Sequence, residues 1–348
     1  MSPPTVVSAP KVSVLMAVRN GGAFLEQALA SMSAQTWHDY ELIVVDDGST
    51  DGSGDRVLAF AGKDRRLRLL RQAPLGLVEA LNRAAGEARG ELWARMDADD
   101  IAHPERLQRQ LEFLARRPEV GVLGTAVRRF GAAHGRWRLP ESDPAAKAAL
   151  LFGTPFAHPT VMLRRAVWKE SGGGYRPEFR AAEDIDLWER LAPHTRFANL
   201  PEVMLDYRVH PAQVTAMAGD SMARNGARVR ERVIRALGLR PSDAERTTHE
   251  AVAWLRRGSL TELAAARSWL ERLVAAESGS PAERAARRSE VARRWFEFCN
   301  CHSRLGREAW RVYREASFRS ADPTSLSRRL RFLLLCAVGP LRFGGLHV

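Results

Sequence analysis

The sequence ELIVVDDGSTDGS (residues 41–53) joins a short apolar run to a cluster of acidic, glycine and hydroxyl residues. A run of four to eight apolar residues bounded by turn residues is typical of a strand buried on both faces. Similar runs occupy residues 12–18, 67–70 and 92–96, and apolar residues recur at helical spacing over 24–32 and 75–88. Strands that alternate with helices predict right-handed β-α-β units and a parallel sheet covered by helices on both faces.

The pattern is less regular after residue 100. A proline at position 104 precedes ERLQRQLEFLARR, which predicts an amphipathic helix. Further strands are expected at 120–127, 161–163 and 203–209, and a helix at 183–191. From about residue 220 every periodic segment is helical, at 224–237, 243–257, 261–276 and 282–298. We expect a disordered lead over residues 1–10, an α/β domain over 11–219 and a basic, all-helical region over 220–348.

The composition is that of a globular protein with an uneven charge. The chain has 348 residues, 45% of them hydrophobic and 27% charged, which argues against disorder. Residues 1–220 hold 28 basic and 28 acidic residues, whereas residues 221–348 hold 25 and 13. The net charge of +12 therefore lies entirely in the last third. A neutral body followed by a cationic region is expected.

Cysteine content and the amino-terminal residues bear on the compartment. Three cysteines, at 299, 301 and 336, cannot build a disulfide framework, which favours a reducing compartment. The run Cys-Asn-Cys-His at 299–302 has no second ligand pair nearby, which disfavours a structural zinc site. No signal peptide is evident, and no apolar run approaches the ~20 residues of a membrane span. We expect a cytoplasmic protein, with peripheral contact at the inner face of the membrane as a further expectation.

Polar residues follow three of the predicted strands directly. Because ligands gather at the carboxyl ends of parallel strands, these residues are expected to share one cleft. They are Arg19 and Asn20, Asp46 and Asp47, and Asp97, Asp99 and Asp100. Asp51 and Asp55 are interpreted instead as turn or helix-capping residues.

The acidic residues at 97–100 predict a divalent metal. Carboxylates at Asp97, Asp99 and Asp100 repel one another at a strand end, and a hard cation such as Mg²⁺ or Mn²⁺ relieves that repulsion. Such a site is commonly completed by substrate phosphates, which favours a nucleotide-diphosphate ligand. The sequence contains neither G-x-G-x-x-G after the first strand nor G-x-x-x-x-G-K-[ST], so a Rossmann dehydrogenase and a P-loop NTPase are disfavoured.

Five segments together resemble a known family. They are VSVLMAVRN (12–20), ELIVVDDGSTDGS (41–53), RMDADDIAHPERLQRQ (95–110), AAEDIDLWERL (181–191) and LDYRVH (205–210). In this order they resemble the family 2 inverting glycosyltransferases with a GT-A fold, over about residues 11–214. The resemblance implies a nucleotide-sugar donor, a divalent metal, inversion at the anomeric carbon and a glycan or lipid-linked acceptor. It makes cell-surface polysaccharide synthesis the expected process.

The resemblance also implies roles on the donor side. Arg19 matches a residue placed against the nucleobase, where the family often has an aromatic side chain. Asp47 or its neighbour Asp46 matches the carboxylate that binds the base, and Ala17 and Arg95 join the substrate-binding residues. The D-x-D motif places Asp97 towards the ribose and Asp99 on the metal, with Asp97 a further metal ligand. His210 matches a histidine near the metal or the diphosphate.

On the acceptor side, Asp184 matches the general base, because an attacking hydroxyl must lose its proton to a group within reach. Glu183 stands beside it, at the predicted start of a helix whose dipole favours an ionised carboxylate. The alternative is that both acids merely complete the helix terminus. His158 looks like a family feature on the acceptor side, and the glycines at 172–174 are either a loop hinge or a plain turn.

The sequence allows more than one interpretation of the contacts of the basic tail and of the overall function. The tail packs onto the body, or its segment SLSRRLRFLLLCAVGPLRFGG (325–345) touches anionic lipids; nucleic-acid binding is disfavoured because arginine alternates with glutamate. One rival function is a sugar-1-phosphate nucleotidyltransferase, which would need a glycine-rich phosphate loop after the first strand. Another is a non-catalytic scaffold that binds nucleotide-sugars.

Overall fold

The computed structural model describes residues 9–213 and 219–338, which form two compact units. One unit holds the residues up to Ala146 together with Thr154–Gly226. The other holds Lys147–Gly153 together with the residues from Ala227 onward. Most of the lead expected to be disordered, residues 1–8, lies outside the described residues.

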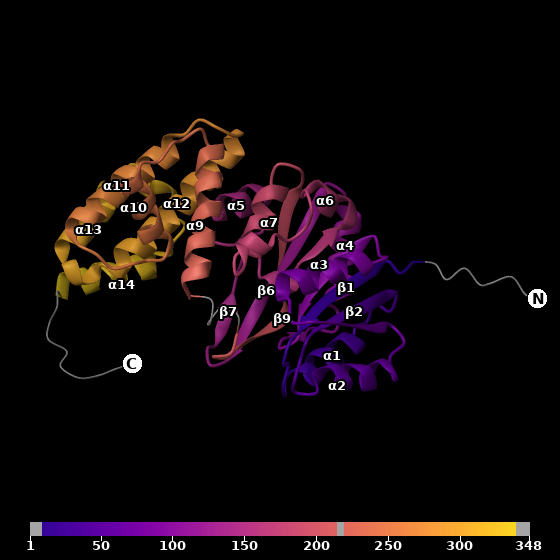
Figure 1. Ribbon diagram of the computed structural model, residues 1–348. Coiled ribbons are helices and arrows are strands. Elements are labelled where there is room, and N and C mark those ends of the chain that lie inside the picture. The colour runs from indigo at the N-terminus through magenta and orange to yellow at the C-terminus, as the bar shows by residue number, and fades with distance from the viewer. Residues whose placement is uncertain (1–8, 214–218, 339–348) are drawn as a thin grey trace, which may run out of the picture. The chain divides into compact units, whose positions relative to one another are not determined.

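In the described chain, one sheet of nine strands forms the frame of the first unit (Figure 1). Its order is β3-β2-β1-β4-β8-β6-β9-β5, with β7 paired to β6. The first four strands in this order are parallel, as predicted, namely β3 (Leu67–Gln72), β2 (Tyr40–Asp47), β1 (Val12–Val18) and β4 (Leu92–Asp97). The remaining strands make the sheet mixed, with only β6 and β9 parallel among β8 (Met162–Arg164), β6 (Val120–Gly131), β9 (Arg196–Val209), β5 (Ile101–Ala102) and β7 (Gly135–Trp137).

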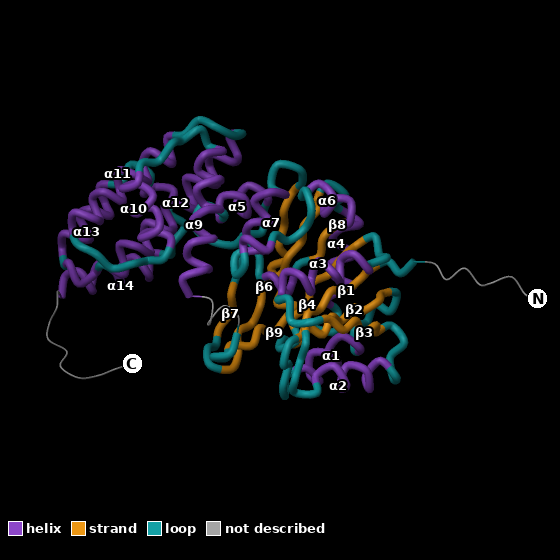
Figure 2. Tube along the Cα trace, viewed as in Figure 1, coloured by secondary structure: helices purple, strands orange, loops and turns teal. Residues whose placement is uncertain are grey.

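Helices cover both faces of this sheet, which confirms the predicted α/β fold class. Helices α1 and α2 lie together on one face of the parallel strands, and α3 lies on the other (Figure 2). The helices are α1 (Leu25–Ser33), α2 (Ser53–Ala61), α3 (Leu77–Glu87), α4 (Arg106–Arg116), α5 (Asp143–Ala149), α6 (Arg165–Glu170) and α7 (Glu183–Leu191). The predicted helices at 24–32, 75–88 and 183–191 are present, and α2, α5, α6 and β7 are additional.

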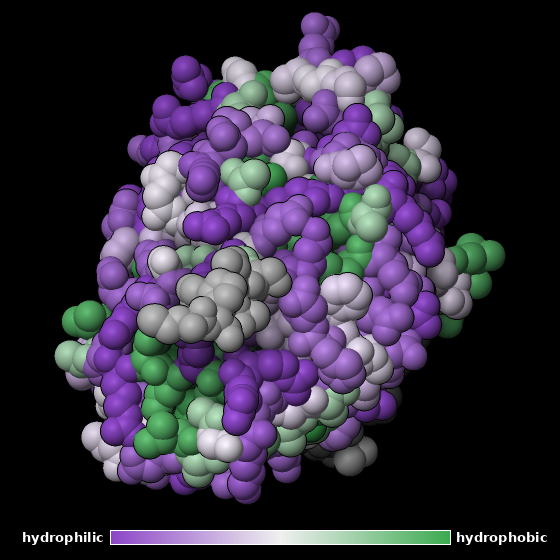
Figure 3. Space-filling view, turned by 90° about the vertical axis from the view of Figure 1, so that its right-hand side faces the viewer, coloured by the Kyte–Doolittle hydropathy of each residue, from purple (hydrophilic) through white to green (hydrophobic). Residues whose placement is uncertain are grey.

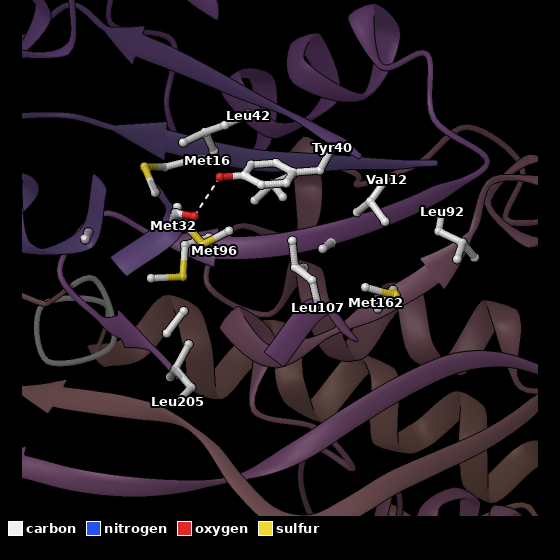
Figure 4. Packing of buried hydrophobic residues seen from close by; sticks show 14 of the residues in the cluster. Val12, Met16, Met32, Tyr40, Leu42, Leu92, Met96, Leu107, Met162 and Leu205 are labelled. Atoms are coloured by element: carbon white, nitrogen blue, oxygen red, sulfur yellow. Dashed lines mark hydrogen bonds between the residues drawn. The ribbon is translucent and has the colours of Figure 1, made fainter. Parts of the chain in front are cut away.

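The alternation of side chains along β1 and β4 sets the chemistry of each sheet face. Val14 and Met16 point into a core shared with α1 and α4, and the Tyr40 hydroxyl donates to the Met32 carbonyl oxygen at 2.6 Å (Figure 4). Side chains two apart on a strand share a face. Arg95 and Asp97 therefore both point to the face opposite this core.

The second unit is helical, as predicted from the spacing of apolar residues. Its helices are α9 (Gly219–Ala236, which begins in the first unit), α10 (Asp243–Ala253), α11 (Leu260–Ala275), α12 (Pro281–Cys301), α13 (Arg307–Glu315) and α14 (Leu326–Val338). Capping boxes begin three of them, at Ser242, Ser259 and Ser280, where serine and glutamate satisfy the first free backbone N–H groups. The helices α13 and α14 were not predicted.

His302 and the neighbouring cysteines serve the packing of this second unit. The His302 Nε2 accepts from the Gly258 N–H at 2.8 Å, and its Nδ1 lies 2.7 Å from the Phe298 carbonyl oxygen. Cys299 and Cys336 are buried, and all three cysteines are free. Both ring nitrogens of His302 are thus occupied by backbone groups.

His249 is a buried histidine whose contacts require the neutral ring. Its Nε2 donates to the Leu151 carbonyl oxygen at 2.7 Å, and its Nδ1 accepts from the Trp269 indole N–H at 3.1 Å. The ring stacks on Phe152. Burial lowers the pKa of His249 to about 4.

Acidification should therefore destabilise the second unit through His249. The folded-state pKa lies below the ~6.5 of an exposed histidine, so the contribution is complete above that pH and is lost as pH falls towards 4. We expect wild type to lose about 2 kcal/mol more than His249→Gln between pH 7.5 and pH 5, in urea unfolding at each pH. Equal losses in the two proteins would contradict this assignment.

One face of the surface and the lengths of the described helices bear on contact with a membrane. On the face in Figure 3, hydrophilic side chains cover most of the surface and hydrophobic ones gather in small groups, as is usual for a surface facing water. Within the described residues, every helix is too short or too polar to cross a membrane.

Candidate active site

The strand register brings the predicted donor residues to one edge of the sheet. Ala17 of β1 lies beside Val45 of β2 and beside Asp97 of β4. Asp46 and Asp47 end β2, and Asp97 ends β4. The predicted gathering of Ala17, Asp46, Asp47 and Asp97 at the carboxyl ends is therefore present, and Arg19 follows β1 as an exposed side chain.

Hydrogen bonds lock the turn after β1 to the loop after β2. Asn20, which has a φ of +53°, accepts from the Thr50 N–H at 2.9 Å and donates its own N–H to Ser49 Oγ at 2.9 Å. The next two N–H groups donate to Ser53 Oγ and to the Asp51 carboxylate. Burial opposes ionisation of Asp51, but hydrogen bonds from Ser53 and Gly22 lower its pKa to about 2. Asp51 thus acts as the turn residue that its position predicted.

The two acids at the end of β2 are engaged with backbone. The Asp47 carboxylate accepts from the N–H groups of Leu75 and Gly76, at 2.8 and 2.9 Å, and from Gln72 Nε2 at 2.8 Å. Asp46 Oδ1 accepts from the Ser49 N–H at 3.0 Å. These carboxylates hold the loops that follow β2 and β3, and their contact with a nucleobase stays a prediction.

Three carboxylates after β4 form a cluster suited to a cation. Asp97, Asp99 and Asp100 each offer an oxygen, and the three oxygens lie within 4.8 Å of one another. Burial raises the pKa of Asp97 and raises that of Asp100 well above its ordinary value, and the neighbouring carboxylates add to the shift. Asp100 Oδ2 is buried without a hydrogen-bond partner among the described residues. Clustered hard oxygens that destabilise one another's charge fit Mg²⁺ or Mn²⁺.

Two buried arginines contact this cluster or the strand that carries it. Arg95 pairs with Asp97, with 2.6 Å between its terminal nitrogen and the carboxylate. Arg106, fully buried on α4, donates to the Arg95 carbonyl oxygen at 2.5 Å, and burial lowers the pKa of Arg106 to about 9. Arg95 and Arg106 are close in the sequence RMDADDIAHPER (95–106), but nothing in that sequence predicted that the Arg106 side chain contacts the backbone of β4.

Residues from the end of β9 complete the cluster. The Arg208 N–H donates to Asp100 Oδ1 at 2.8 Å, and the Arg208 guanidinium donates to the Asp99 carbonyl oxygen at 2.7 Å. The guanidinium lies 4.3 Å from the ring of Phe24 and 4.5 Å from that of Phe130, so two cation–π contacts hold it. Arg208 was not predicted, although it stands two residues before His210 in the LDYRVH segment.

His210 reaches the carboxylate that the D-x-D motif assigns to the metal. Its Nε2 lies 2.9 Å from Asp99 Oδ2, and its ring packs against Phe24 with 5.0 Å between centroids. The structure therefore brings together Asp97, Asp99 and His210, which are the three predicted metal ligands.

Two further acids begin α7. Ala181 just before them has a φ of +65°, a left-handed conformation that a side chain disfavours. Burial, and then the charge of its neighbour, raises the pKa of Glu183 to about 7, and burial raises the pKa of Asp184 to about 6. Backbone N–H groups at the helix start oppose the shift of Asp184. Glu183 Oε2 is buried and lacks a hydrogen-bond partner among the described residues.

His158 and Tyr175 lie beside these acids. His158 Nε2 is 2.7 Å from the Tyr175 hydroxyl, and burial lowers the pKa of His158 well below its ordinary value. Burial also raises the pKa of Tyr175, and Arg95, Glu183, Asp184 and Asp97 all act on it electrostatically. Burial therefore favours the neutral forms of both side chains, and carboxylates of both acidic clusters act on the Tyr175 hydroxyl.

The glycines at 172–174 form an ordered turn that positions Tyr175. All three have positive φ, and a Cβ on Gly174 would lie 2.4 Å from Trp168. The backbone of Tyr175 exchanges two hydrogen bonds with the Asn82 side chain on α3, at 2.8 and 3.0 Å. The segment has the geometry of a turn, and its role as a loop hinge stays a prediction. Asn82 and Tyr175 belong to no motif that could be recognised in the sequence, so neither was predicted as a site residue.

Arg95 connects the two acidic clusters electrostatically. It pairs with Asp97, and its charge opposes the raised pKa values of both Glu183 and Asp184. Two of its three guanidinium nitrogens are buried without partners among the described residues. The arrangement combines a carboxylate cluster suited to a cation with a carboxylate that has a pKa suited to proton transfer near neutral pH.

Comparison with known proteins identifies the family of the chain. The model of the family described as "Glycosyl transferase family 2" matches residues 13–172. The putative glycosyltransferase EpsE of Bacillus subtilis is 34% identical over 209 residues, which are 58% of this chain and 74% of EpsE. The chain therefore belongs to glycosyltransferase family 2. It is also 28% identical, over 57% of its length and 74% of the relative, to the UDP-Gal:alpha-D-GlcNAc-diphosphoundecaprenol beta-1,3-galactosyltransferase of Escherichia coli.

Two solved structures share the fold. Residues 1–349 of S. aureus TarS, in complex with UDP-GlcNAc, align with a TM-score of 0.56 and 18% identity over 90% of this chain and 92% of that one. The mannosyltransferase PcManGT from Pyrobaculum calidifontis, in complex with GDP-Man and Mn²⁺, aligns with a TM-score of 0.55 and 20% identity, over 94% of this chain and 88% of its own. The predicted GT-A fold is thus confirmed.

Proposed function

We propose that this glycosyltransferase is metal-dependent and inverting, and that it transfers a sugar from a nucleotide-diphosphate donor to a hydroxyl of a glycan or lipid-linked acceptor. The observation that carries the proposal is the pair of acidic clusters whose charges Arg95 couples, one suited to a cation and one to proton transfer. The Mn²⁺ complex of PcManGT supports the metal, and its GDP-Man and the UDP-GlcNAc of TarS support the class of donor.

On the donor side, Asp97 and Asp99 would hold the cation, with His210 at the Asp99 carboxylate. When bound, a divalent cation neutralises the charge of the departing nucleoside diphosphate. Arg95 orients Asp97, and Arg208 fixes the backbone of Asp99 and the carboxylate of Asp100. Ala17, Arg19, Asp46 and Asp47 border the space assigned to the nucleoside.

On the acceptor side, Asp184 would take the proton of the attacking hydroxyl as that oxygen bonds to the anomeric carbon. Glu183 raises the local negative charge, and His158 with Tyr175 lines the acceptor side. Because Asp184 acts on the acceptor and no sugar ester forms, a single displacement inverts the anomeric centre.

The names of relatives support the proposed acceptor and place of action. The Escherichia coli relative acts, by its name, on a diphosphoundecaprenol-linked sugar, and EpsE of Bacillus subtilis is named a putative glycosyltransferase. An amylovoran biosynthesis glycosyltransferase of Erwinia amylovora, AmsE, is 33% identical over 56% of this chain and 74% of its own length. We therefore place the reaction in polysaccharide synthesis at the cytoplasmic face of a membrane, which the basic carboxy-terminal region contacts.

A donor panel tests the proposal. The purified chain is incubated with UDP-, GDP- and dTDP-sugars, with Mn²⁺, Mg²⁺ or a chelator, and released nucleoside diphosphate is measured. We expect metal-dependent release from donors of one base. Binding without release under every condition would indicate a non-catalytic scaffold, and pyrophosphate release from a nucleoside triphosphate with a sugar-1-phosphate would indicate a nucleotidyltransferase.

A further inference from the structure

We propose that one face of α14 docks onto a membrane surface rich in anionic lipids. Of the seven large hydrophobic side chains that are exposed in the described residues, four lie on this helix. They are Leu326, Leu330, Leu334 and Leu335, with exposed fractions of 71%, 50%, 63% and 45%. Leu326, Leu330 and Leu334 follow one another at i, i+4 and i+8, so they form a stripe along one side of the helix, roughly 12 Å long.

The opposite side of α14 is firmly packed, so the stripe is a true outer face. Phe332 and Cys336 are buried on that side. The centroid of the Phe332 ring lies 5.5 to 5.7 Å from the centroids of the Phe296, Trp310 and Tyr313 rings. Figure 1 shows the position of α14 among the helices of the second unit. At 100° per residue, Leu330 and Leu334 point away from Phe332. The second unit therefore holds the helix by one face and leaves the leucines outward.

The charge on and around α14 indicates the chemistry of the partner. The helix carries three arginines and no acidic residue, and residues 300–338 hold eight arginines against three acids. Arg329 is engaged with Asp322, and the Arg328 guanidinium lies 5.4 Å from the centroid of the Phe296 ring, whereas Arg331 is exposed and lies beside Leu334 at 100° per residue. Leucines flanked by arginines suit a helix that lies in a lipid interface, where the leucines enter the acyl boundary and the arginines meet anionic headgroups.

Other occupants of the stripe fit less well. Four leucine side chains on one helix cannot by themselves supply the ~800 Å² per partner of a stable dimer interface. A nucleic acid would use the arginines but leave the leucines in water. The helix lies among those too short to span a bilayer, so contact is in the interface plane.

The inference deepens the proposed function, because a lipid-linked acceptor resides at such a surface, yet it can be tested without any sugar transfer. The full chain is sedimented with vesicles of phosphatidylcholine alone or with about one third phosphatidylglycerol. We expect binding to the anionic vesicles, weakened at least about tenfold by Leu330→Gln with Leu334→Gln. Arg331→Gln should weaken binding to anionic vesicles selectively.

A matched control uses an equally exposed leucine elsewhere. Leu58→Gln, on α2 with an exposed fraction of 58%, should bind vesicles like wild type. Thermal unfolding checks that each variant is folded, and donor hydrolysis in vesicle-free solution checks the active site separately. Wild type that ignores anionic vesicles, or an unaffected leucine double variant, would overturn the proposal, as would a wild-type dimer that the double variant makes monomeric.

Discussion

Asp184→Asn is expected to lower the rate of sugar transfer by roughly 10²- to 10⁴-fold while the affinity for donor changes little. The asparagine keeps the size and the hydrogen bonds of the helix start but cannot accept a proton. The side chain lies at α7, apart from the metal-suited carboxylates after β4, so donor binding does not depend on it. Transfer rate and donor affinity are measured on the same protein, by product formation and by calorimetry.

The raised pKa of Asp184 predicts how the rate of sugar transfer depends on pH. Burial raises the pKa of Asp184 to about 6, and the base must be ionised, so wild-type activity should fall about tenfold per unit below pH 6. The residual activity of Asp184→Asn should not show this fall below pH 6. Glu189→Gln, which changes another acid on the same helix, serves as the matched control and should keep it. Equal loss of donor affinity and rate in Asp184→Asn would contradict the assigned role.

Asp99→Asn is expected to remove the metal dependence of donor binding and to lower transfer at least about a hundredfold. Asp99 shares a cluster with two other carboxylates and with His210, and its loss leaves fewer hard oxygens for the cation. Calorimetric titration with Mn²⁺ in the presence of the nucleoside diphosphate of the best donor measures the effect.

The control for Asp99→Asn is an acid outside this cluster. Asp55→Asn removes an exposed carboxylate that pairs with Arg71 on the loop side of α2. It should leave Mn²⁺ binding and transfer as in wild type. If Asp55→Asn weakened Mn²⁺ binding as much as Asp99→Asn, a general loss of negative charge would explain both results, and the assignment of Asp99 would fail.

In the first unit, the sequence predicted strands that bury apolar runs and missed two short helices that do not. The strands at 12–18 and 92–96 were predictable because their side chains are buried on both faces. Helix α6 buries none of its six residues, so its sequence carries no apolar period. Helix α2 buries a single aliphatic residue, Val57, and directly follows the acidic loop. Its sequence therefore shows no apolar period that would predict a helix.

For the site, sequence position predicted the acids but not the residues that hold them. Asp97 and Asp184 could be predicted because each marks the end or start of an element with a recognisable pattern. Arg208 binds Asp100 across 108 residues, and Asn82 binds Tyr175 across 93, and no local spacing encodes such contacts. Asp47 shows the reverse: its place at the end of β2 suggested a ligand contact, whereas its carboxylate accepts three hydrogen bonds from the end of β3 and the loop that follows it.

Calorimetry of nucleoside diphosphate binding, with saturating Mn²⁺ and with excess chelator, tests most directly whether the acids after β4 form a metal-dependent donor site. We expect one of UDP, GDP or dTDP to bind at least about tenfold more tightly with Mn²⁺ than with chelator. Identical affinities in the two conditions for every nucleotide would show that Asp97, Asp99 and Asp100 do not hold a cation for the donor, and would contradict the proposed mechanism.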